Sequence, residues 1–207
     1  MSTIQTILNS GKIIPVVTLE KPEDAVPVAE ALLEGGIQTI EITLRTEAAI
    51  AAIEVLARKN TGITIGAGTV TTATQFRQVM EAGAAFVVSP GMTDSLLRYA
   101  SQKSMPYLPG IATASEIMIA LEHGITAFKF FPAESMGGTA TLKHLSAVFP
   151  QVRFCPTGGV TAENMQQYLA LSGVVCIGGS WLVAKEDLRM QDWKHITQKA
   201  RHALSLV

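Results

Sequence analysis

A lysine in an apolar run is the residue whose type and position most clearly suggest chemistry. Lys129 stands in the segment AFKFFPAE, with two apolar residues on either side of it. If this segment is a strand, Phe128 and Phe130 share one face, most simply the face that helices cover, and Lys129 points to the interior. An amine that loses hydration there is more often neutral, and hence nucleophilic, at pH 7. The pattern favours a Schiff base with a carbonyl compound over a lysine that merely reaches solvent.

A carboxylate and a guanidinium in the segment TIEITLRTE form a second candidate group. Glu41, Thr43 and Arg45 are two residues apart, so they share one face of an extended chain. One interpretation is a buried Glu41–Arg45 ion pair that stabilises the fold. The other is a carboxylate base with a guanidinium fork that binds a substrate carboxylate. Beside an inward-pointing Lys129, the second interpretation predicts proton transfer at carbon combined with carboxylate recognition.

Two glycine clusters late in the chain, PTGGV and IGGSW, follow apolar runs. Glycine lets backbone N–H groups come close to an anion, and neighbouring hydroxyl groups add hydrogen bonds. In a parallel α/β barrel, the loops after the last two strands are the recurrent phosphate site. The sequence therefore predicts a phosphate site there, in preference to ordinary tight turns. Its candidate residues are Thr157, Gly158, Gly159, Gly178, Gly179 and Ser180.

The remaining candidate residues carry weaker signals. The segment GAGTV lacks the third glycine of a dinucleotide-binding fingerprint, because Thr71 stands in its place. We interpret it as a tight turn from strand to helix, with Thr69 at the mouth of the site. The four histidines fall in helical stretches without metal-ligand spacing at a strand end, so we expect no metal and disfavour a metal-dependent aldolase or hydrolase. Cys155 and Cys176 lie in apolar runs without a CxxC spacing and are expected to be buried, reduced thiols.

The elements that must position these side chains alternate regularly along the chain. The expected strands are Ile13–Val17, Thr39–Thr43, Ile63–Ile65, Phe86–Val88, Pro106–Leu108, Ala127–Phe130, Val152–Cys155 and Val174–Ile177. The amphipathic stretches between them include Glu23–Glu34, Glu47–Arg58, Ala73–Glu81, Ser115–Glu122 and Ala162–Leu171. Strict alternation implies parallel strands, and eight near-regular units favour a closed (β/α)8 TIM barrel over an open doubly wound sheet. We expect one domain over residues 1–207, with a short extra helix at Ser2–Ser10.

Composition excludes several classes of protein. The chain has 207 residues, of which 48% are hydrophobic and 16% charged, and its formal net charge is -1. This balance gives no electrostatic basis for binding nucleic acid or an anionic membrane, and no apolar run is long enough for a transmembrane helix. The N-terminal segment MSTIQTILNS lacks the basic leader and apolar core of a signal peptide. We therefore expect a cytoplasmic protein whose partner is a small molecule, with no nucleic-acid or membrane partner.

Taken in order, the segments EITLRTE, GAGTV, SPG, PGI, FKFFPAE, RFCPTGG and CIGGSW resemble the bacterial 2-keto-3-deoxy-6-phosphogluconate (KDPG) aldolases. That family also includes enzymes that act on 4-hydroxy-2-oxoglutarate (KHG). The resemblance spans Ile13 to Ala184 and implies a homotrimer of (β/α)8 barrels that works as a metal-free class I aldolase without a cofactor. It implies that Lys129 forms the Schiff base and that Glu41 is the general acid/base. The implied substrate-binding residues are Arg45 and Thr69 for the pyruvate carboxylate, Pro90, Phe131 and Thr157 around the pyruvyl group, and Gly158, Gly159 and Ser180 for the phosphate.

The same resemblance implies cleavage of KDPG to pyruvate and glyceraldehyde 3-phosphate, and of KHG to pyruvate and glyoxylate. Three alternatives remain open at this point. A sister aldolase would keep the lysine chemistry but act on the galactonate epimer or on KHG. A phosphosugar epimerase or synthase would share the phosphate loops without needing Lys129. A non-catalytic sugar-phosphate-binding barrel would bind its ligand without turnover.

Overall fold

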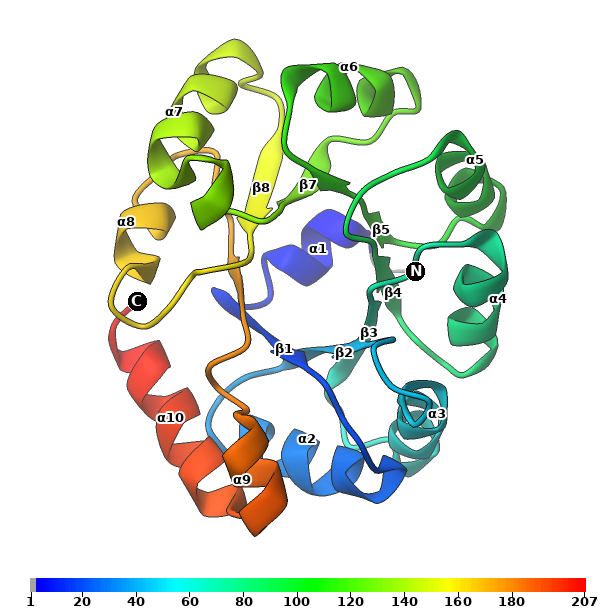
Figure 1. The fold of residues 1–207 in the computed structure, drawn as a ribbon, viewed down its shortest axis with the longest axis vertical. Coiled ribbons are helices and arrows are strands. Elements are labelled where there is room, and N and C mark those ends of the chain that lie inside the picture. The colour runs from blue at the N-terminus through cyan, green and yellow to red at the C-terminus, as the bar shows by residue number, and fades with distance from the viewer. Residues whose placement is uncertain (1–2) are drawn as a thin grey trace.

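The computed structural model describes residues 3–207 and has an α/β fold, in which strands and helices alternate. Figure 1 shows the strands in the middle and most of the helices around the outside of them. The strands are β1 (Ile13–Val17), β2 (Thr39–Thr43), β3 (Thr64–Gly68), β4 (Phe86–Val88), β5 (Tyr107–Leu108), β6 (Gly110–Ile111), β7 (Ala127–Phe130), β8 (Arg153–Pro156) and β9 (Ile177–Gly179). The helices are α1 (Ile4–Leu8), α2 (Ala25–Glu34), α3 (Ala49–Lys59), α4 (Ala73–Glu81), α5 (Asp94–Lys103), α6 (Ala114–Glu122), α7 (Gly138–Val148), α8 (Met165–Leu169), α9 (Lys185–Met190) and α10 (Trp193–Ser205), with short 3-10 helices η1 (Pro22–Asp24) and η2 (Glu134–Met136).

The strands form a curled parallel sheet in two segments. Hydrogen bonds connect six strands in the order β5-β4-β3-β2-β1-β9 and three in the order β6-β7-β8, and the described pairs are parallel. Isolated parallel bridges join Phe154 to Val174 and Thr157 to Gly178, which brings β8 beside β9. On the other side of the curl, Pro109 alone separates β5 from β6. A proline interrupts the ladder there because it has no N–H to donate.

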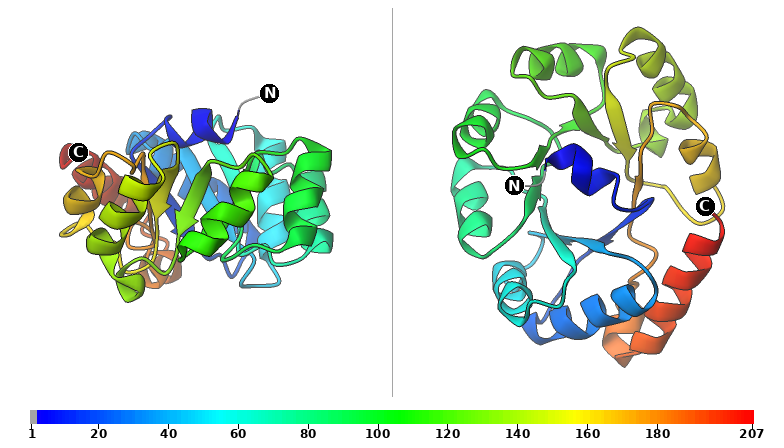
Figure 2. Two further views of the ribbon diagram at one scale, coloured as in Figure 1. Left: turned by 90° about the horizontal axis from the view of Figure 1, so that it is seen from above. Right: turned by 180° about the vertical axis from the view of Figure 1, so that it is seen from behind.

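Apolar side chains form two clusters, one on each face of the sheet. The larger cluster packs between the strands and the surrounding helices and includes Phe128, Phe130 and Phe154. The smaller, inner cluster includes the strand residues Ile14, Phe86, Val88, Leu108, Ala127 and Cys155, and Cys176 directly before β9. Ile7 and Leu8 of α1 belong to this inner cluster, and Figure 2 shows α1 lying across the middle of the strands. Because α1 leads into β1, it covers the amino ends of the strands and leaves their carboxyl ends for a site.

The segment GAGTV is not the tight turn that the sequence suggested. β3 was expected to end at Ile65, but it continues through Gly66 to Gly68. The physical reason is crowding on the inner face, since a Cβ at Gly66 would overlap the ring of Phe86. Glycine serves close packing within the strand here, and the turn begins only at the next residue.

The last strand is also displaced from its expected place. It was predicted at Val174–Ile177, whereas β9 covers Ile177–Gly179. A Cβ at Gly178 would overlap the side chain of Thr157 on the neighbouring segment. Both glycines of this cluster therefore lie in a strand that packs closely against the end of β8, and not in the loop that the sequence suggested.

Other predicted elements differ from the structure by a few residues at their ends. The helix expected at Ala73–Glu81 agrees with α4, whose N-cap Thr72 accepts a hydrogen bond from the backbone of Gln75 at 3.2 Å. The helix expected at Ala162–Leu171 shortens to α8, because turns precede it. The N-terminal helix expected at Ser2–Ser10 is α1, and its first expected residue lies outside the described residues.

The longest of the described helices is α10, with 13 residues. A helix that crosses a bilayer needs about 20 predominantly apolar residues. Among residues 3–207, no helix combines the length and the hydropathy for such a crossing.

Candidate active site

The residues predicted to act on a substrate follow the carboxyl ends of strands. Arg45 follows β2, Thr69 follows β3, Pro90 follows β4, Phe131 follows β7, Thr157 follows β8 and Ser180 follows β9. Parallel strands bring their carboxyl ends to the same edge of a sheet. These loops therefore share one edge, which is the edge where parallel α/β folds place their active sites.

Two buried ionisable side chains meet on the inner face of the curled sheet. Lys129 on β7 donates a hydrogen bond from Nζ to Oε1 of Glu41 on β2, at 2.9 Å, and the two side chains are only 7% and 4% exposed. Phe128 and Phe130 lie in the outer cluster. The predicted alternation is thus confirmed, and Lys129 points inward. Glu41 pairs with this lysine, so the alternative of a Glu41–Arg45 ion pair is wrong.

Space for the Glu41 carboxylate depends on a glycine of the neighbouring strand. A Cβ at Gly68 would overlap Oε1 and Cδ of Glu41. Among residues 3–207, Lys129 is the one hydrogen-bond donor to this carboxylate. A carboxylate accepts up to about four hydrogen bonds. Glu41 therefore keeps hydrogen-bonding capacity that a substrate hydroxyl or a water molecule can use.

An aromatic ring and a hydroxyl group lie close to the lysine. The ring centroid of Phe131 is 5.5 Å from Lys129 Nζ, a distance at which a ring face attracts an ammonium group. Thr157 is buried, and its Oγ1 donates to the backbone oxygen of Cys155 at 3.4 Å. A Cβ at Gly158 would lie 3.3 Å from the Phe131 ring, so the loop after β8 packs against the loop after β7. The structure thus brings the lysine, the ring and the start of the glycine loop together.

Arg45 lies in a turn and not on the strand. β2 ends at Thr43, and the Arg45 backbone N–H donates to the Thr43 oxygen at 2.8 Å. The two-residue spacing therefore does not extend to Arg45, and that part of the prediction is wrong. The residue is exposed and lines a surface hollow of about 600 Å³ together with Glu20 and Glu47. At this edge its guanidinium is available to an anionic group of a ligand.

Two further loops at the same edge have constrained backbones. Thr69 has φ of 61°, in the left-handed region that residues with a Cβ rarely adopt, and such conformations cluster at functional sites. Pro90 is exposed. Its neighbour Ser89 donates a hydrogen bond from Oγ to the backbone oxygen of Gly91, and the same Oγ bonds the hydroxyl of Tyr107 at 2.6 Å. These bonds fix the residues on both sides of Pro90. Burial, partly offset by the hydrogen bond with Ser89, raises the pKa of Tyr107 to about 12, so that hydroxyl stays protonated.

The loop after β8 has the conformation expected of a glycine-rich anion site. Gly158 and Gly159 have φ of 96° and 79°, so two successive residues take the left-handed region. Glu134 supports this loop, because its backbone N–H donates to the Gly158 oxygen at 3.0 Å and its side chain packs where a Cβ of Gly159 would lie. Tyr168 donates a hydrogen bond to the Glu134 carboxylate. Ser180, on the neighbouring loop after β9, is exposed.

A polar cluster near the C-terminus was missed in the sequence. Asp187 of α9 is 5% exposed and bonds both His195 and Lys199 of α10. The available signal was the spacing of His195 and Lys199, which are four residues apart and therefore on one face of a helix, after an acidic residue in the preceding helix. The histidines are otherwise at or near the surface, as expected.

The cysteines are buried and unpaired, as the sequence predicted. Hydrogen bonding with Cys155, together with burial, raises the pKa of the Cys176 thiol, and a protonated thiol is a poor nucleophile. Within residues 3–207, no group of three or more histidine, cysteine or acidic side chains is placed to hold a metal ion.

A lysine amine buried against a carboxylate, at the carboxyl edge of a parallel α/β sheet, defines the class of site that forms Schiff bases with carbonyl compounds. Comparison with known proteins gives the family. The model of the KDPG and KHG aldolase family matches residues 4–199. The chain belongs to the KDPG and KHG aldolase family, and both the resemblance and the aldolase class predicted from the motifs are confirmed.

Individual relatives are similar over nearly the whole chain. The KHG/KDPG aldolase of Escherichia coli (strain K12) is 46% identical over 203 residues, which cover 98% of this chain and 95% of the relative. A crystal structure of the KDPG aldolase from Legionella pneumophila, with pyruvate captured at low pH as a covalent carbinolamine intermediate, is 44% identical with a TM-score of 0.96 and covers 98% of both chains. The KDPG aldolase of Zymomonas mobilis ZM4 with 3-phosphoglycerate is 41% identical with a TM-score of 0.94, and covers 99% of this chain and 96% of that one.

Proposed function

We propose that this protein cleaves KDPG to pyruvate and glyceraldehyde 3-phosphate through a Schiff base on Lys129, and that it also cleaves KHG to pyruvate and glyoxylate. The observation that carries the proposal is the buried contact of 2.9 Å between Lys129 Nζ and Glu41 Oε1. The carbinolamine of the Legionella relative supports covalent chemistry at the pyruvyl end. The Escherichia coli relative is a KHG/KDPG aldolase, which supports both substrates.

The first half of the reaction forms the Schiff base. Lys129 must attack the C2 ketone as a neutral amine, and Glu41 lies close enough to take the proton from Nζ. Addition of the amine to C2 gives a carbinolamine. The protonated Glu41 then returns the proton to the carbinolamine oxygen, which leaves as water, and an iminium remains.

The second half breaks the carbon–carbon bond. The Glu41 carboxylate removes the proton of the C4 hydroxyl, directly or through a water molecule, and C4 leaves as the aldehyde. The electron pair of the C3–C4 bond moves into the iminium and gives an enamine in place of a bare carbanion. Glu41 then protonates C3, and hydrolysis of the resulting iminium releases pyruvate and the free lysine.

Binding of the pyruvyl group is assigned to residues around the lysine. Arg45 and Thr69 hold the carboxylate, which sets the angle of attack on C2. Phe131 and Pro90 line the sides of the pocket. Support comes from the position of all four after carboxyl ends of strands and from the 5.5 Å between the Phe131 ring and Lys129 Nζ.

Binding of the phosphate is assigned to the loops after β8 and β9. Gly158 and Gly159 present backbone N–H groups from left-handed conformations, and Thr157 and Ser180 add hydroxyl donors. The parallel bridge between Thr157 and Gly178 places the two loops side by side. The Zymomonas relative with 3-phosphoglycerate supports a phosphorylated ligand for a site of this family.

We also propose that the curled sheet closes into a (β/α)8 TIM barrel and that residues 1–207 form one domain. Closure is supported by the bridges between β8 and β9, and by β5 and β6 acting as one strand that Pro109 interrupts. The partition of apolar side chains into an inner and an outer cluster is the arrangement that a barrel requires.

A homotrimer that works in the cytoplasm completes the proposal. The trimer follows from the family resemblance, and two exposed apolar neighbours on α6, Met118 at 59% and Ile119 at 49%, are candidates for burial between subunits. Multi-angle light scattering should give the mass of three chains. The buried, unpaired cysteines suit a reducing compartment.

Pyruvate release tests the reaction directly. Purified protein is mixed with KDPG, KHG or the galactonate epimer of KDPG, and pyruvate is followed through lactate dehydrogenase and NADH. We expect kcat/KM to be higher for KDPG than for KHG, because KHG leaves the phosphate contacts unused, and the comparison with the galactonate epimer gives the epimer preference. A chain that binds phosphosugars but releases no pyruvate from any of the three would contradict the proposed function.

A further inference from the structure

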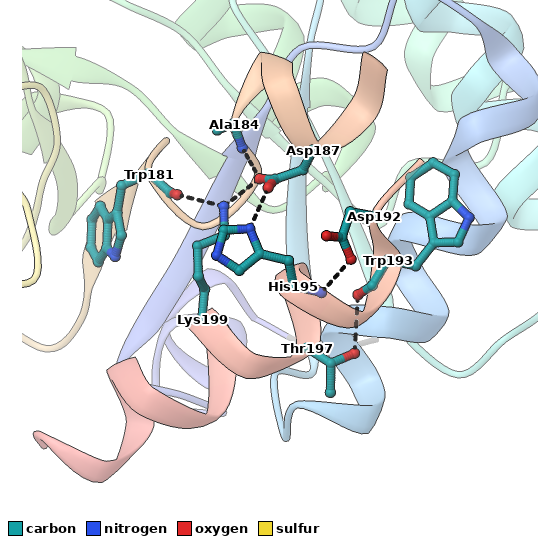
Figure 3. Close-up of polar contacts among 8 residues, drawn as sticks. All are labelled: Trp181, Ala184, Asp187, Asp192, Trp193, His195, Thr197 and Lys199. Atoms are coloured by element: carbon teal, nitrogen blue, oxygen red, sulfur yellow. Dashed lines mark hydrogen bonds and ion pairs between the residues drawn. The ribbon is translucent and has the colours of Figure 1, made fainter. Parts of the chain in front are cut away.

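Asp187 is the centre of a closed polar cluster between α9, α10 and the loop after β9 (Figure 3). Its carboxylate accepts hydrogen bonds from the backbone N–H of Ala184 at 2.8 Å, from Nδ1 of His195 at 2.7 Å, and from the ammonium of Lys199. Burial disfavours the charged form, but these hydrogen bonds outweigh it and lower the pKa of Asp187. The carboxylate is therefore ionised at neutral pH and accepts three hydrogen bonds from the protein.

Lys199 connects this carboxylate to the loop after β9. Its Nζ also donates to the backbone oxygen of Trp181 at 3.3 Å. The segment from Trp181 to Ala184 is thus held at both ends, at one by Lys199 and at the other by Asp187. The two side chains bond each other, so loop and side chains form a ring of contacts (Figure 3).

This loop begins directly after Ser180, which the proposed function assigns to the phosphate. The ring of Trp181 packs against the backbone of Gly179, where any added Cβ would overlap it. The carbonyl that Lys199 holds belongs to the peptide that follows Trp181, one residue from Ser180. A loop that binds an anion through short polar groups must be positioned to about 0.5 Å to be effective.

We propose that the Asp187–Lys199 pair is a positioning device that sets the loop after β9 for the phosphorylated end of the substrate. This inference rests on the proposed function. It assigns to the pair no contact with the reacting atoms, so its loss should affect binding of phosphorylated substrates and leave the chemistry at Lys129 in place.

The chain offers a matched control in His195. This residue bonds the same carboxylate as Lys199, but its side chain is 52% exposed, and among the described residues it has no hydrogen bond to the loop. A cluster that merely stabilises the junction of α9 and α10 would respond to both residues alike. A positioning device would respond through Lys199 alone.

The experiment compares Lys199→Met with His195→Gln in the full chain. For each variant, kcat and KM are measured with KDPG and with KHG, which carries no phosphate. We expect Lys199→Met to raise KM for KDPG by roughly tenfold, because one charge-assisted hydrogen bond is lost. The same variant should leave kcat/KM for KHG within about twofold of the wild-type value. His195→Gln should leave both substrates within about twofold. Should Lys199→Met fail to fold, Lys199→Gln serves, with the same difference between substrates expected.

Two outcomes would overturn the inference. One is an equal loss, or no loss, for the two substrates in the lysine variant. The other is a normal KM for KDPG in the double variant Asp187→Asn/Lys199→Met. That result would show that the raised KM of Lys199→Met comes from the unpaired charge of Asp187, and not from a displaced loop. Failure of the proposed function is distinct, because it would appear in the unaltered protein as an absence of pyruvate from KDPG and KHG.

Discussion

Two pairs of a lysine with a buried carboxylate occupy different regions of this molecule. Lys129 and Glu41 meet inside the curled sheet, between β7 and β2, whereas Lys199 and Asp187 meet between α10 and α9. The two carboxylate side chains are almost equally buried, at 4% and 6% exposure. The lysines differ more, at 7% exposure for Lys129 and 21% for Lys199, so burial of the carboxylate alone does not separate the two pairs.

The pairs differ in how completely their hydrogen bonds are satisfied. Asp187 accepts from a backbone N–H, a histidine and a lysine, whereas Glu41 accepts from Lys129 alone among residues 3–207. A carboxylate held by three protein donors is fixed, while one with a single protein donor keeps more capacity to exchange a proton with a ligand. Unused hydrogen-bonding capacity near the carboxyl ends of the strands therefore distinguishes Glu41 and Lys129, the pair that we propose to be reactive, from Asp187 and Lys199.

The largest expected effect comes from removing the amine of the inner pair. Lys129→Met should lower kcat/KM for KDPG by at least about 10⁴-fold, because no covalent intermediate can form. The coupled pyruvate assay measures this. The corresponding change at the outer pair, Lys199→Met, should leave kcat for KHG intact. Near-normal turnover by the Lys129 variant would remove the distinction between the two pairs.

Removal of the charge of Glu41 should come next. Glu41→Gln keeps the shape of the side chain but cannot accept a proton, so we expect kcat to fall by about 10² to 10⁴-fold. Borohydride trapping of pyruvate should become slower but should still occur on Lys129. The pH profile of kcat provides the check, and an unchanged profile would show that another group moves the proton.

A smaller effect should follow from filling the space beside Glu41. Gly68→Ala adds a Cβ that overlaps the carboxylate and must displace it from Lys129. We expect kcat to fall on the order of tenfold to a hundredfold, the range that misplacement of a catalytic group produces. Gly11→Ala is a control on space alone, since a Cβ there meets no atom within 4 Å and the residue lies outside the left-handed region. Full activity in the Gly68 variant would mean that the Glu41 position is not critical.

The smallest effect concerns the outer pair and pH. The pKa of Asp187 is lowered in the folded state, so its stabilising contribution is present above the unfolded value of about 3.9 and is lost as pH falls through the folded pKa. In urea unfolding, the free energy of unfolding of the wild type should therefore fall on acidification below about pH 4. The fall should be smaller for Asp187→Asn, which has no carboxylate at this position to protonate. Identical acid dependence in both proteins would contradict this account of the cluster.

Much of the site follows from the sequence through the two-residue period of strands. Alternation placed Lys129 inward between Phe128 and Phe130, because both rings could be buried only against the helices. The same rule failed at Arg45, since the strand ends at Thr43 and a tight turn follows. The alternation of inward and outward side chains cannot show where a strand ends when the residues that follow could also belong to the strand.

Features that depend on contacts distant in sequence escaped prediction. Gly66 and Gly68 resemble a turn in the sequence, but they belong to β3. Glycine is needed there because the ring of Phe86 and the carboxylate of Glu41, from the neighbouring strands, occupy the space that side chains would take. The partner of Glu41 is 88 residues away, whereas the local spacing offered the nearer Arg45 as one alternative. Asp187 looks like an ordinary residue of a helix first turn, and only the packing of α10 shows its role.

The most direct test of the central claim is borohydride reduction of the protein mixed with pyruvate, followed by intact mass measurement and peptide mapping. We expect one reduced pyruvyl adduct per chain, located on Lys129, with Lys199 unmodified although it too is paired with a buried carboxylate. An adduct on another lysine, or no adduct in a protein that still releases pyruvate from KDPG, would contradict it.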